Sequence, residues 1–396
     1  MALRIRPLLA CALLAVAVAH GDVLPPDEAD AMYKHYEGGG IVAEGPAYLV
    51  RKSIGDQVSV HAEYEIDQVT GASIDMITSG ASPLREDRKA KSLGVDYLRE
   101  KTTYSLIALS SIENDYDSST VNFSIAQSMF GDLTTVTLSA SKGWDVITKR
   151  VNPSGVEGGA TIDDPNFGRQ HLDRRNWSLG ISQIVTRNLI MGFNYEANTE
   201  QGYTQNPYRS IRYLDPTSAS GFSFAPEVYP TTRTGNAFAF KAKYYLPWHA
   251  AANGGFRYYY DTWGIRAQTY DLGYTQPFLD EALIADVTYR YYTQNSASFY
   301  SDLFPRANYQ TYMARDRELS SLYTEAFGGG ISYDFMRSPW RFLKKSTISY
   351  RIDEIWYRYR DFRNAYVEET QHLVPGTGPL YRNNALSQQV YVQFYF

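Results

Sequence analysis

Polar and apolar residues alternate with a period of two along most of the chain. This is the pattern of β-strands that present one apolar and one polar face. The clearest stretch is the last one, in which one face carries Val390, Val392, Phe394 and Phe396. About fourteen such stretches can be recognised, near residues 58–67, 93–97, 103–112, 121–125, 135–141, 177–182, 189–196, 238–244, 255–260, 264–275, 283–291, 322–335, 346–358 and 389–396.

The connections between these stretches alternate between short and long. Short links are found at 100–102, 130–132, 186–188, 247–254, 275–281 and 336–345. Longer ones are found near 68–90, 142–173, 200–235, 296–318 and 361–384, with two shorter hairpins on the same side at 113–119 and 261–263. Bacterial barrels have short periplasmic turns and longer extracellular loops. We therefore predict an all-β fold, a transmembrane antiparallel β-barrel of about fourteen strands in the outer membrane of a Gram-negative cell.

The alternative to this fold is a secreted soluble sandwich or propeller, which would also alternate. It gives no reason for sorted loop lengths or for an aromatic last strand. A barrel gives that reason, because the last strand must pair with the first to leave no open edge in hydrocarbon.

The first residues have the features of a secretory signal. Arg4 and Arg6 precede an apolar run, Leu8 to Ala19, that is too short to span a membrane as a helix. We expect a signal peptide of residues 1–19, with residue 21 as the alternative end. Cys11 lies inside it and resembles a lipid-attachment cysteine only weakly, because the apolar run continues beyond it.

Residues 20–47 differ from the rest of the exported chain. Pro25 and Pro26 precede several acids, and a short helix is predicted to end at Gly38 to Gly40. We predict a periplasmic N-terminal arm or a plug for residues 20–47, with a disordered leader as the alternative. The barrel is then expected over residues 48–396.

The composition agrees with a barrel and excludes several other classes. The chain has 34 Tyr, 18 Phe and 6 Trp, and barrels place aromatic girdles at both membrane interfaces. No segment after the signal is apolar for long enough to be a transmembrane helix. The formal charge of −5 becomes −7 when Arg4 and Arg6 are removed, with 36 basic against 43 acidic residues, so nucleic acid is not an expected partner. Without Cys11 the chain has no cysteine for a disulfide or a thiolate site.

No motif for catalysis, a cofactor or a metal is recognisable. The six histidines form no metal-binding pair, and no phospholipase-type motif is present. We therefore expect no enzyme, no cofactor and no metal. Two acidic clusters, at 113–117 and 163–166, could supply oxygen ligands for calcium, but turn formation explains them better. Gly328 to Gly330 are expected to mark a bulge or strong curvature in a strand.

An acidic track is the most conspicuous candidate site. Glu63, Glu65 and Asp67 share the polar face of one predicted strand, with His61 two positions before Glu63. In a barrel this face points into the lumen, since charges facing lipid are costly. The other residues expected to face the lumen are Arg266, Arg290, Arg351 and Asp353. These charges either pair across the interior and fill it, or line an aqueous path and favour cations.

Several segments also resemble a family of Gram-negative outer-membrane proteins known only as a domain of unknown function. They are YKHYEGGG (33–40), GPAYLVRK (45–52), YEIDQVTGAS (64–73), SGASPLREDR (79–88) and GVDY (94–97). The resemblance implies a barrel over the whole mature chain and supplies no activity or ligand. Genes of this family tend to lie near those for a thioredoxin-like periplasmic protein, a small lipoprotein and a flavin transferase, so the resemblance also suggests an exported redox system.

The function expected from these observations is a channel or transporter for a small solute or an exported product, gated by the N-terminal arm. The competing function is a non-conducting barrel that anchors or displays a small lipoprotein or a periplasmic redox partner. An outer-membrane hydrolase is the least favoured. Expected partners common to all three are outer-membrane lipid, lipopolysaccharide and the barrel-assembly machinery, which would recognise the C-terminal strand.

Overall fold

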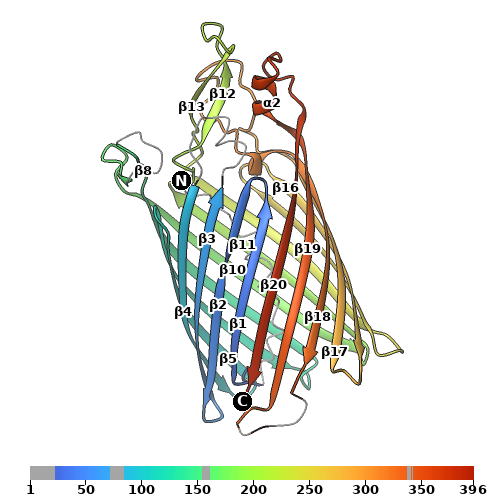
Figure 1. The fold of residues 1–396 in the computed structure, drawn as a ribbon. Helices are drawn as coiled ribbons and strands as arrows, with labels where there is room; N and C mark the ends of the chain where they lie inside the picture. Colours follow the sequence, from blue (N-terminus) through green and yellow to red (C-terminus); the bar gives the residue numbers. More distant parts are fainter. Residues whose placement is uncertain (1–22, 72–83, 154–160, 337–339, 341) are drawn as a thin grey trace.

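The chain folds into a closed antiparallel β-barrel in which neighbouring strands are mostly consecutive (Figure 1). The computed structural model describes residues 23–71, 84–153, 161–336, 340 and 342–396. The expected signal peptide lies outside these residues. In order around the barrel the strands are β1 (Glu28–Gly38), β2 (Ile41–Ile54), β3 (Val58–Gly71), β4 (Leu84–Arg99), β5 (Thr102–Ile112), β6 (Tyr116–Met129), β7 (Thr134–Ile147), β10 (Gln170–Thr186), β11 (Leu189–Gly202), β14 (Thr232–Tyr245), β15 (Ala251–Asp261), β16 (Arg266–Phe278), β17 (Leu283–Gln294), β18 (Leu322–Asp334), β19 (Lys345–Arg363) and β20 (Leu380–Tyr395).

The barrel has sixteen strands where the sequence predicted about fourteen, and the two additional strands are β1 and β2. They occupy most of residues 20–47, so the predicted arm or plug and its short helix are wrong. The glycines expected to end a helix form the turn between two strands instead. Gly39 and Gly40 have φ of 63° and 79°, which favour glycine because it has no Cβ. Residues 28–47, within the described part of this segment, therefore form barrel wall and a turn and not a gating arm.

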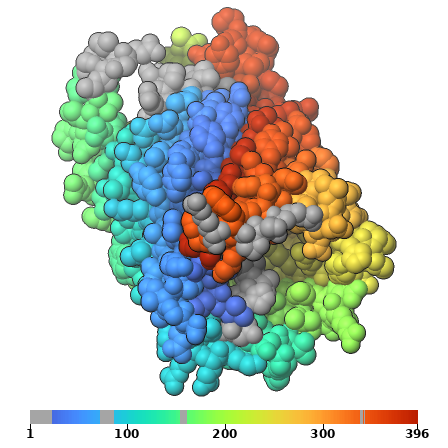
Figure 2. Space-filling model, turned by 60° about the horizontal axis from the view of Figure 1, so that its bottom comes forward, coloured from blue at the N-terminus to red at the C-terminus, as the bar shows by residue number. Residues whose placement is uncertain are grey.

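The first and last strands close the barrel, as the sequence predicted. β1 pairs with β20 over its whole length, with Ala29 opposite Phe394 and Tyr33 opposite Val390. Viewed toward the end that holds the C-terminus, the N-terminal strands lie directly beside the C-terminal ones (Figure 2). Every strand of the barrel thus has two neighbours, and no backbone edge of the barrel is left open to lipid.

The two ends of the barrel differ as the loop lengths predicted. Tight turns such as 55–57, 100–101 and 187–188 lie at the end that holds the C-terminus. The other end carries the long connections, with the small hairpins β8–β9 (Arg150–Val151, Ile162–Asp163) and β12–β13 (Ser210–Leu214, Phe222–Pro226) and the helix α2 (Ala365–Thr370). The short-turn end is the periplasmic one and the long-loop end is the extracellular one.

The outer face of the barrel is apolar over its middle. Tyr64, Leu93, Leu106 and Leu138 are 41–57% exposed although they lie within strands. Along each strand, these outward apolar residues alternate with residues of the inner face. This exposed apolar band is the surface that a bilayer covers, and the protein is an outer-membrane barrel. Among the described residues no helix is long and apolar enough to cross a membrane.

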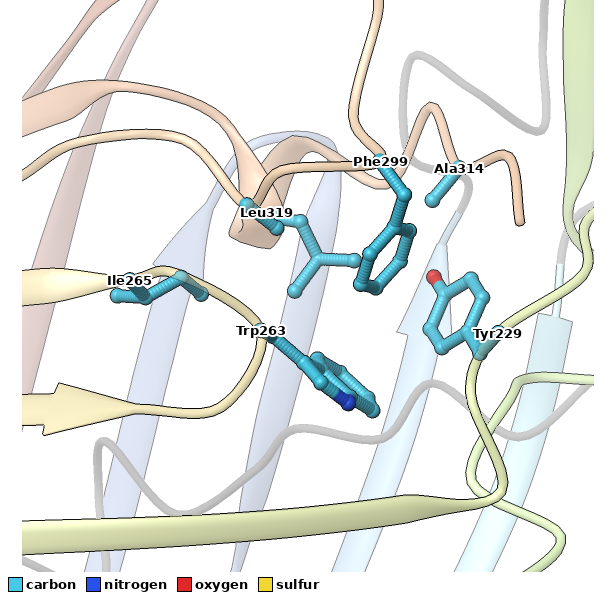
Figure 3. Close-up of a cluster of buried hydrophobic side chains, with 7 residues drawn as sticks. Tyr229, Trp263, Ile265, Phe299, Ala314 and Leu319 are labelled. Atoms are coloured by element: carbon cyan, nitrogen blue, oxygen red, sulfur yellow. The ribbon is translucent and has the colours of Figure 1, made fainter. Parts of the chain in front are cut away.

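Three extracellular loops pack together into a structure that we call the outer cap, made of residues 203–231, 295–321 and 364–379. Its apolar core contains Tyr229, Phe299, Ala314 and Leu319, packed on Trp263 and Ile265 from the β15–β16 turn. Their side chains point toward one another (Figure 3). Isolated bridges Tyr213–Phe304 and Val228–Met313 join two of the loops. The outer cap is therefore an ordered small core at the extracellular mouth.

Candidate functional site: the charged inner wall

The acidic track lies on the inner face of β3. Glu63, Glu65 and Asp67 alternate with Tyr64 and Ile66, and Tyr64 is 41% exposed on the outer face. Directly paired residues on neighbouring strands share a face, so the β4 residues opposite the acids also point inward. These are Ser92, Ala90 and Arg88 in the order of the three acids. The period-two phase thus places the track where it was expected.

Two basic residues hold the track, and neither was foreseen. Lys34 of β1 pairs with Glu65 and lies 2.8 Å from Asp67. Arg88 of β4 approaches the same two acids, at 3.4 Å and 2.7 Å. The Lys34, Glu65 and Asp67 side chains are only 12–16% exposed. The sequence proposed Arg266, Arg290 and Arg351 as partners, but these lie on β16, β17 and β19, four or more strands away from β3.

Glu63 differs from the other two acids of the track. Among the described residues Glu63 accepts one hydrogen bond, from the Ser92 hydroxyl at 3.5 Å. Its carboxylate is therefore not held by a lysine or arginine as Glu65 is. The track consequently combines a braced pair of acids with one acid that no described lysine or arginine contacts.

His61 belongs to a second cluster, closer to the periplasm. Its ring lies against Gly94 of β4, where a Cβ would come within 2.2 Å of two ring atoms. His61 Nδ1 is 3.6 Å from Asp96, which also accepts hydrogen bonds from Arg51 at 2.6 Å and Ser105 at 2.5 Å. This cluster joins four consecutive strands, β2 to β5, on their inner face.

Arg351 and Asp353 form a third cluster on the opposite side of the seam. The Arg351 guanidinium contacts Asp353 at 2.7 Å and Asp286 of β17 at 2.9 Å, and donates to Thr288 at 2.6 Å. The intervening β18 has glycine there. A Cβ on Gly328 would lie 1.9 Å from Asp353 Oδ1, and one on Gly330 would lie 2.4 Å from Asp286 Oδ1.

These contacts correct the interpretation of the glycine run. The register of β17 with β18 is continuous through Gly328 to Gly330, so the run is not a bulge. The glycines leave room for the charged side chains of the two neighbouring strands.

Of the two remaining residues predicted to face the lumen, Arg290 does and Arg266 does not. Arg290 faces inward and pairs with Asp271 of β16 at 2.5 Å. Arg266 does not face the lumen, so that prediction is wrong. It is paired with Tyr260 and lies on the opposite face from Asp271. Arg266 is the first residue of β16, at the extracellular end, where an outward charge reaches water or lipid headgroups.

The inner faces of β6, β7 and β10 carry small hydroxylic side chains. Ser124, Ser139 and Ser178 lie side by side across these strands, and the last two share a hydrogen bond of 2.6 Å. Farther around, Lys241 and Lys243 of β14 are exposed on the inner face. The inner wall thus carries polar side chains around the barrel, and those on β6, β7 and β10 are small.

Buried ion pairs hold the outer cap together. Arg212 is fully buried and contacts Glu368 at 2.6 Å and Asp302 at 3.1 Å, and Arg315 contacts Asp302 at 3.0 Å. These pairs connect all three loops of the cap. Period-two alternation cannot reveal them, because it applies to strands and not to loops.

A buried carboxyl in the same cap is expected to titrate near neutrality. Glu227 accepts hydrogen bonds from the Arg315 backbone N–H at 2.6 Å and the Tyr229 hydroxyl at 2.7 Å. Burial, and then the nearby charge of Asp316, raise the pKa of Glu227 to about 7, against an opposing effect of Arg209.

Comparison with known proteins assigns the family. The family model described as "Protein of unknown function (DUF3570)" matches residues 75–381. No curated protein matches the chain.

Solved structures with similar folds include a bacterial polysaccharide outer membrane secretin, with 7% identity, TM-score 0.48, and 95% of this chain and 100% of the other covered. The siderophore receptor PirA from Pseudomonas aeruginosa has 12% identity and TM-score 0.41, with 85% of this chain and 57% of the receptor covered. OmpT, an outer membrane protein of Vibrio cholerae, has 9% identity and TM-score 0.39, with 93% and 100% covered. The likeness to these proteins is too low to carry an argument about function. The family match covers most of the chain, and the protein therefore belongs to the DUF3570 family.

Proposed function

We propose that the barrel is a channel that passes small hydrophilic solutes across the outer membrane. One observation carries the proposal: sixteen strands enclose an inner wall that includes a side of small hydroxylic residues, Ser124, Ser139 and Ser178. Barrels of eight strands are filled by their side chains, whereas barrels of sixteen to eighteen strands leave an aqueous channel. The outer cap lies at the extracellular mouth, where it would limit what enters.

The charge of the wall supports a preference for cations on the β3 side. Lys34 and Arg88 compensate Glu65 and Asp67, and Glu63 remains without such a partner among the described residues. A carboxylate in an aqueous path raises the local concentration of cations.

The test is the conductance of the purified full chain in planar bilayers. We expect discrete steps and, in a salt gradient, a reversal potential that indicates a cation preference. Glu63→Gln should reduce that preference without changing the folded state. Glu354→Gln, which removes a carboxylate from the outer face of β19, is the matched control and should leave the preference unchanged.

Absence of steps above those of protein-free bilayers would refute the channel. It would favour the competing function, a non-conducting barrel that anchors a lipoprotein or a periplasmic redox partner. Steps with identical selectivity in the Glu63→Gln protein would keep the channel but remove the role proposed for Glu63.

A further inference from the structure

Three carboxylates from two segments meet at the extracellular end of the inner wall. Glu86 comes from the start of β4, and Glu113 and Asp115 come from the turn between β5 and β6. One oxygen of each lies within 4.8 Å of the others. We call this group the mouth carboxylates. From the sequence, only Glu113 and Asp115 were recognisable as members of an acidic cluster, and turn formation could explain both of them.

The burial of Glu86 distinguishes this group from an ordinary acidic turn. The Glu86 residue is only 3% exposed, and its Oε1 accepts no hydrogen bond from a described residue. A buried carboxylate oxygen without a hydrogen bond is costly, and the cost rises when other carboxylates lie close to it. A turn does not need a third acid contributed by another strand.

An arginine beside the group also contacts the acidic track. Arg88 Nε is 3.8 Å from Glu113, but the same guanidinium contacts Glu65 and Asp67 of the acidic track. One arginine therefore serves acids on both sides of it. Tyr208 of the outer cap is also close, since its hydroxyl forms a side-chain hydrogen bond with Asp115.

The spacing of the oxygens fits a cation of the size of calcium. Ca²⁺ binds oxygen ligands at about 2.3–2.6 Å, so two ligands on opposite sides of the ion are about 5 Å apart. Oxygens that all lie within 4.8 Å of one another can therefore share one ion. Calcium also accepts six to eight oxygens in flexible geometry, with water completing the set, whereas Mg²⁺ demands a tighter octahedron.

We propose that Glu86, Glu113 and Asp115 bind a hard divalent cation, Ca²⁺ in preference to Mg²⁺, at the extracellular mouth of the barrel. The ion joins the start of β4 to the β5–β6 turn and offsets the repulsion among the three closely spaced carboxylates. The affinity expected is that of extracellular calcium modules, with Kd on the order of 10⁻⁴–10⁻³ M. This site does not depend on whether the barrel conducts.

The probe for the site is Tb³⁺, which resembles Ca²⁺ in size and ligand preference and luminesces when a nearby tyrosine is excited. Tyr208 lies beside the mouth carboxylates. The full mature chain, refolded in a zwitterionic detergent, contains no lipopolysaccharide whose phosphates could bind the ion instead. We expect saturable luminescence that Ca²⁺ displaces at lower concentration than Mg²⁺ does.

Glu86→Gln and Asp115→Asn each remove one ligand, and each should weaken Tb³⁺ binding by at least roughly tenfold, since even outer-shell partners contribute 10–100-fold to metal affinity. Asp117→Asn is the matched control: Asp117 is close in sequence but exposed and outside the group. Its binding should equal that of the unmodified chain.

A second measurement applies if one variant does not refold: Ca²⁺ should raise the melting temperature of the unmodified chain and of Asp117→Asn. Ca²⁺ should not raise the melting temperature of whichever of the variants Glu86→Gln and Asp115→Asn does refold. Binding that does not saturate, or that survives Glu86→Gln and Asp115→Asn, would overturn the proposal. So would a melting temperature that is insensitive to Ca²⁺.

Discussion

Lys34 offers the sharpest test of the brace around the acidic track. Lys34→Met removes the ammonium group that contacts Glu65 and Asp67 and keeps most of the aliphatic length. Removing one partner of a fully buried ion pair costs about 3–5 kcal/mol, and an exposed pair contributes about 0–1 kcal/mol. The side chains here are 12–16% exposed and Arg88 remains, so we expect a loss of about 2 kcal/mol.

The assay is urea-induced unfolding of the barrel in detergent, followed by the folded band on gels without boiling. Lys52→Met on the neighbouring strand is the control. Lys52 also pairs with an aspartate, Asp27, but is 60% exposed, so its loss should cost less than about 1 kcal/mol.

A double-mutant cycle with Asp67→Asn makes the test specific. If Lys34 and Asp67 interact as the structure shows, the double variant should be more stable than the sum of the two single losses predicts. Additive effects, or a Lys34→Met loss no larger than that of Lys52→Met, would refute the brace.

Three further outcomes are expected. Gly328→Ala should destabilise the folded barrel by about 1–3 kcal/mol in the same gel assay because its Cβ would overlap Asp353, whereas Gly329→Ala, whose Cβ has its nearest contact at 3.7 Å, should not. A cysteine at Thr377 should react with an impermeant maleimide on intact cells and one at Arg187 should not; the reverse pattern would mean that the barrel is inverted. Because the folded-state pKa of Glu227 is raised above the usual 4.5 to about 7, the folded state keeps a proton that the unfolded state releases, so stability should fall as pH rises from about 4.5 to 7 and then level off. Glu227→Gln should reduce this difference in melting temperature between pH 5 and pH 7.5, and an unchanged difference would count against the raised pKa.

The sequence predicted the elements that obey a simple period and missed those that do not. Each of the fourteen predicted stretches overlaps a strand of the barrel, three of them extending one or two residues beyond it, and the long loops lie at one end. β1 and β2 were missed because prolines and glycines flank β1. Its outer face begins with Ala29 and Ala31, which give little apolar contrast.

The partners of the candidate site were less predictable than its orientation. The period of a strand determines which face a residue occupies, so Glu63, Glu65 and Asp67 were assigned correctly to the inner side. It does not determine which strand lies beside it or in which register, so Lys34 and Arg88 could not be identified. Arg266 was misassigned because it is the first residue of its strand, where the alternation is not yet established.

The seam between β1 and β20 also has a consequence for how the barrel is assembled. Most neighbouring strands are joined by hairpins or loops and can pair soon after they meet, but the seam joins Asp30 to Gln393, with a hydrogen bond of 3.1 Å that spans 363 positions. Contacts between distant residues form slowly because the chain must first be brought together. Closure of the seam should therefore be the last and rate-limiting step of assembly. Until it occurs, both terminal strands are open edges that can pair with another chain. Substitutions along the seam should consequently slow assembly and promote aggregation more than they lower the stability of barrels that have already closed.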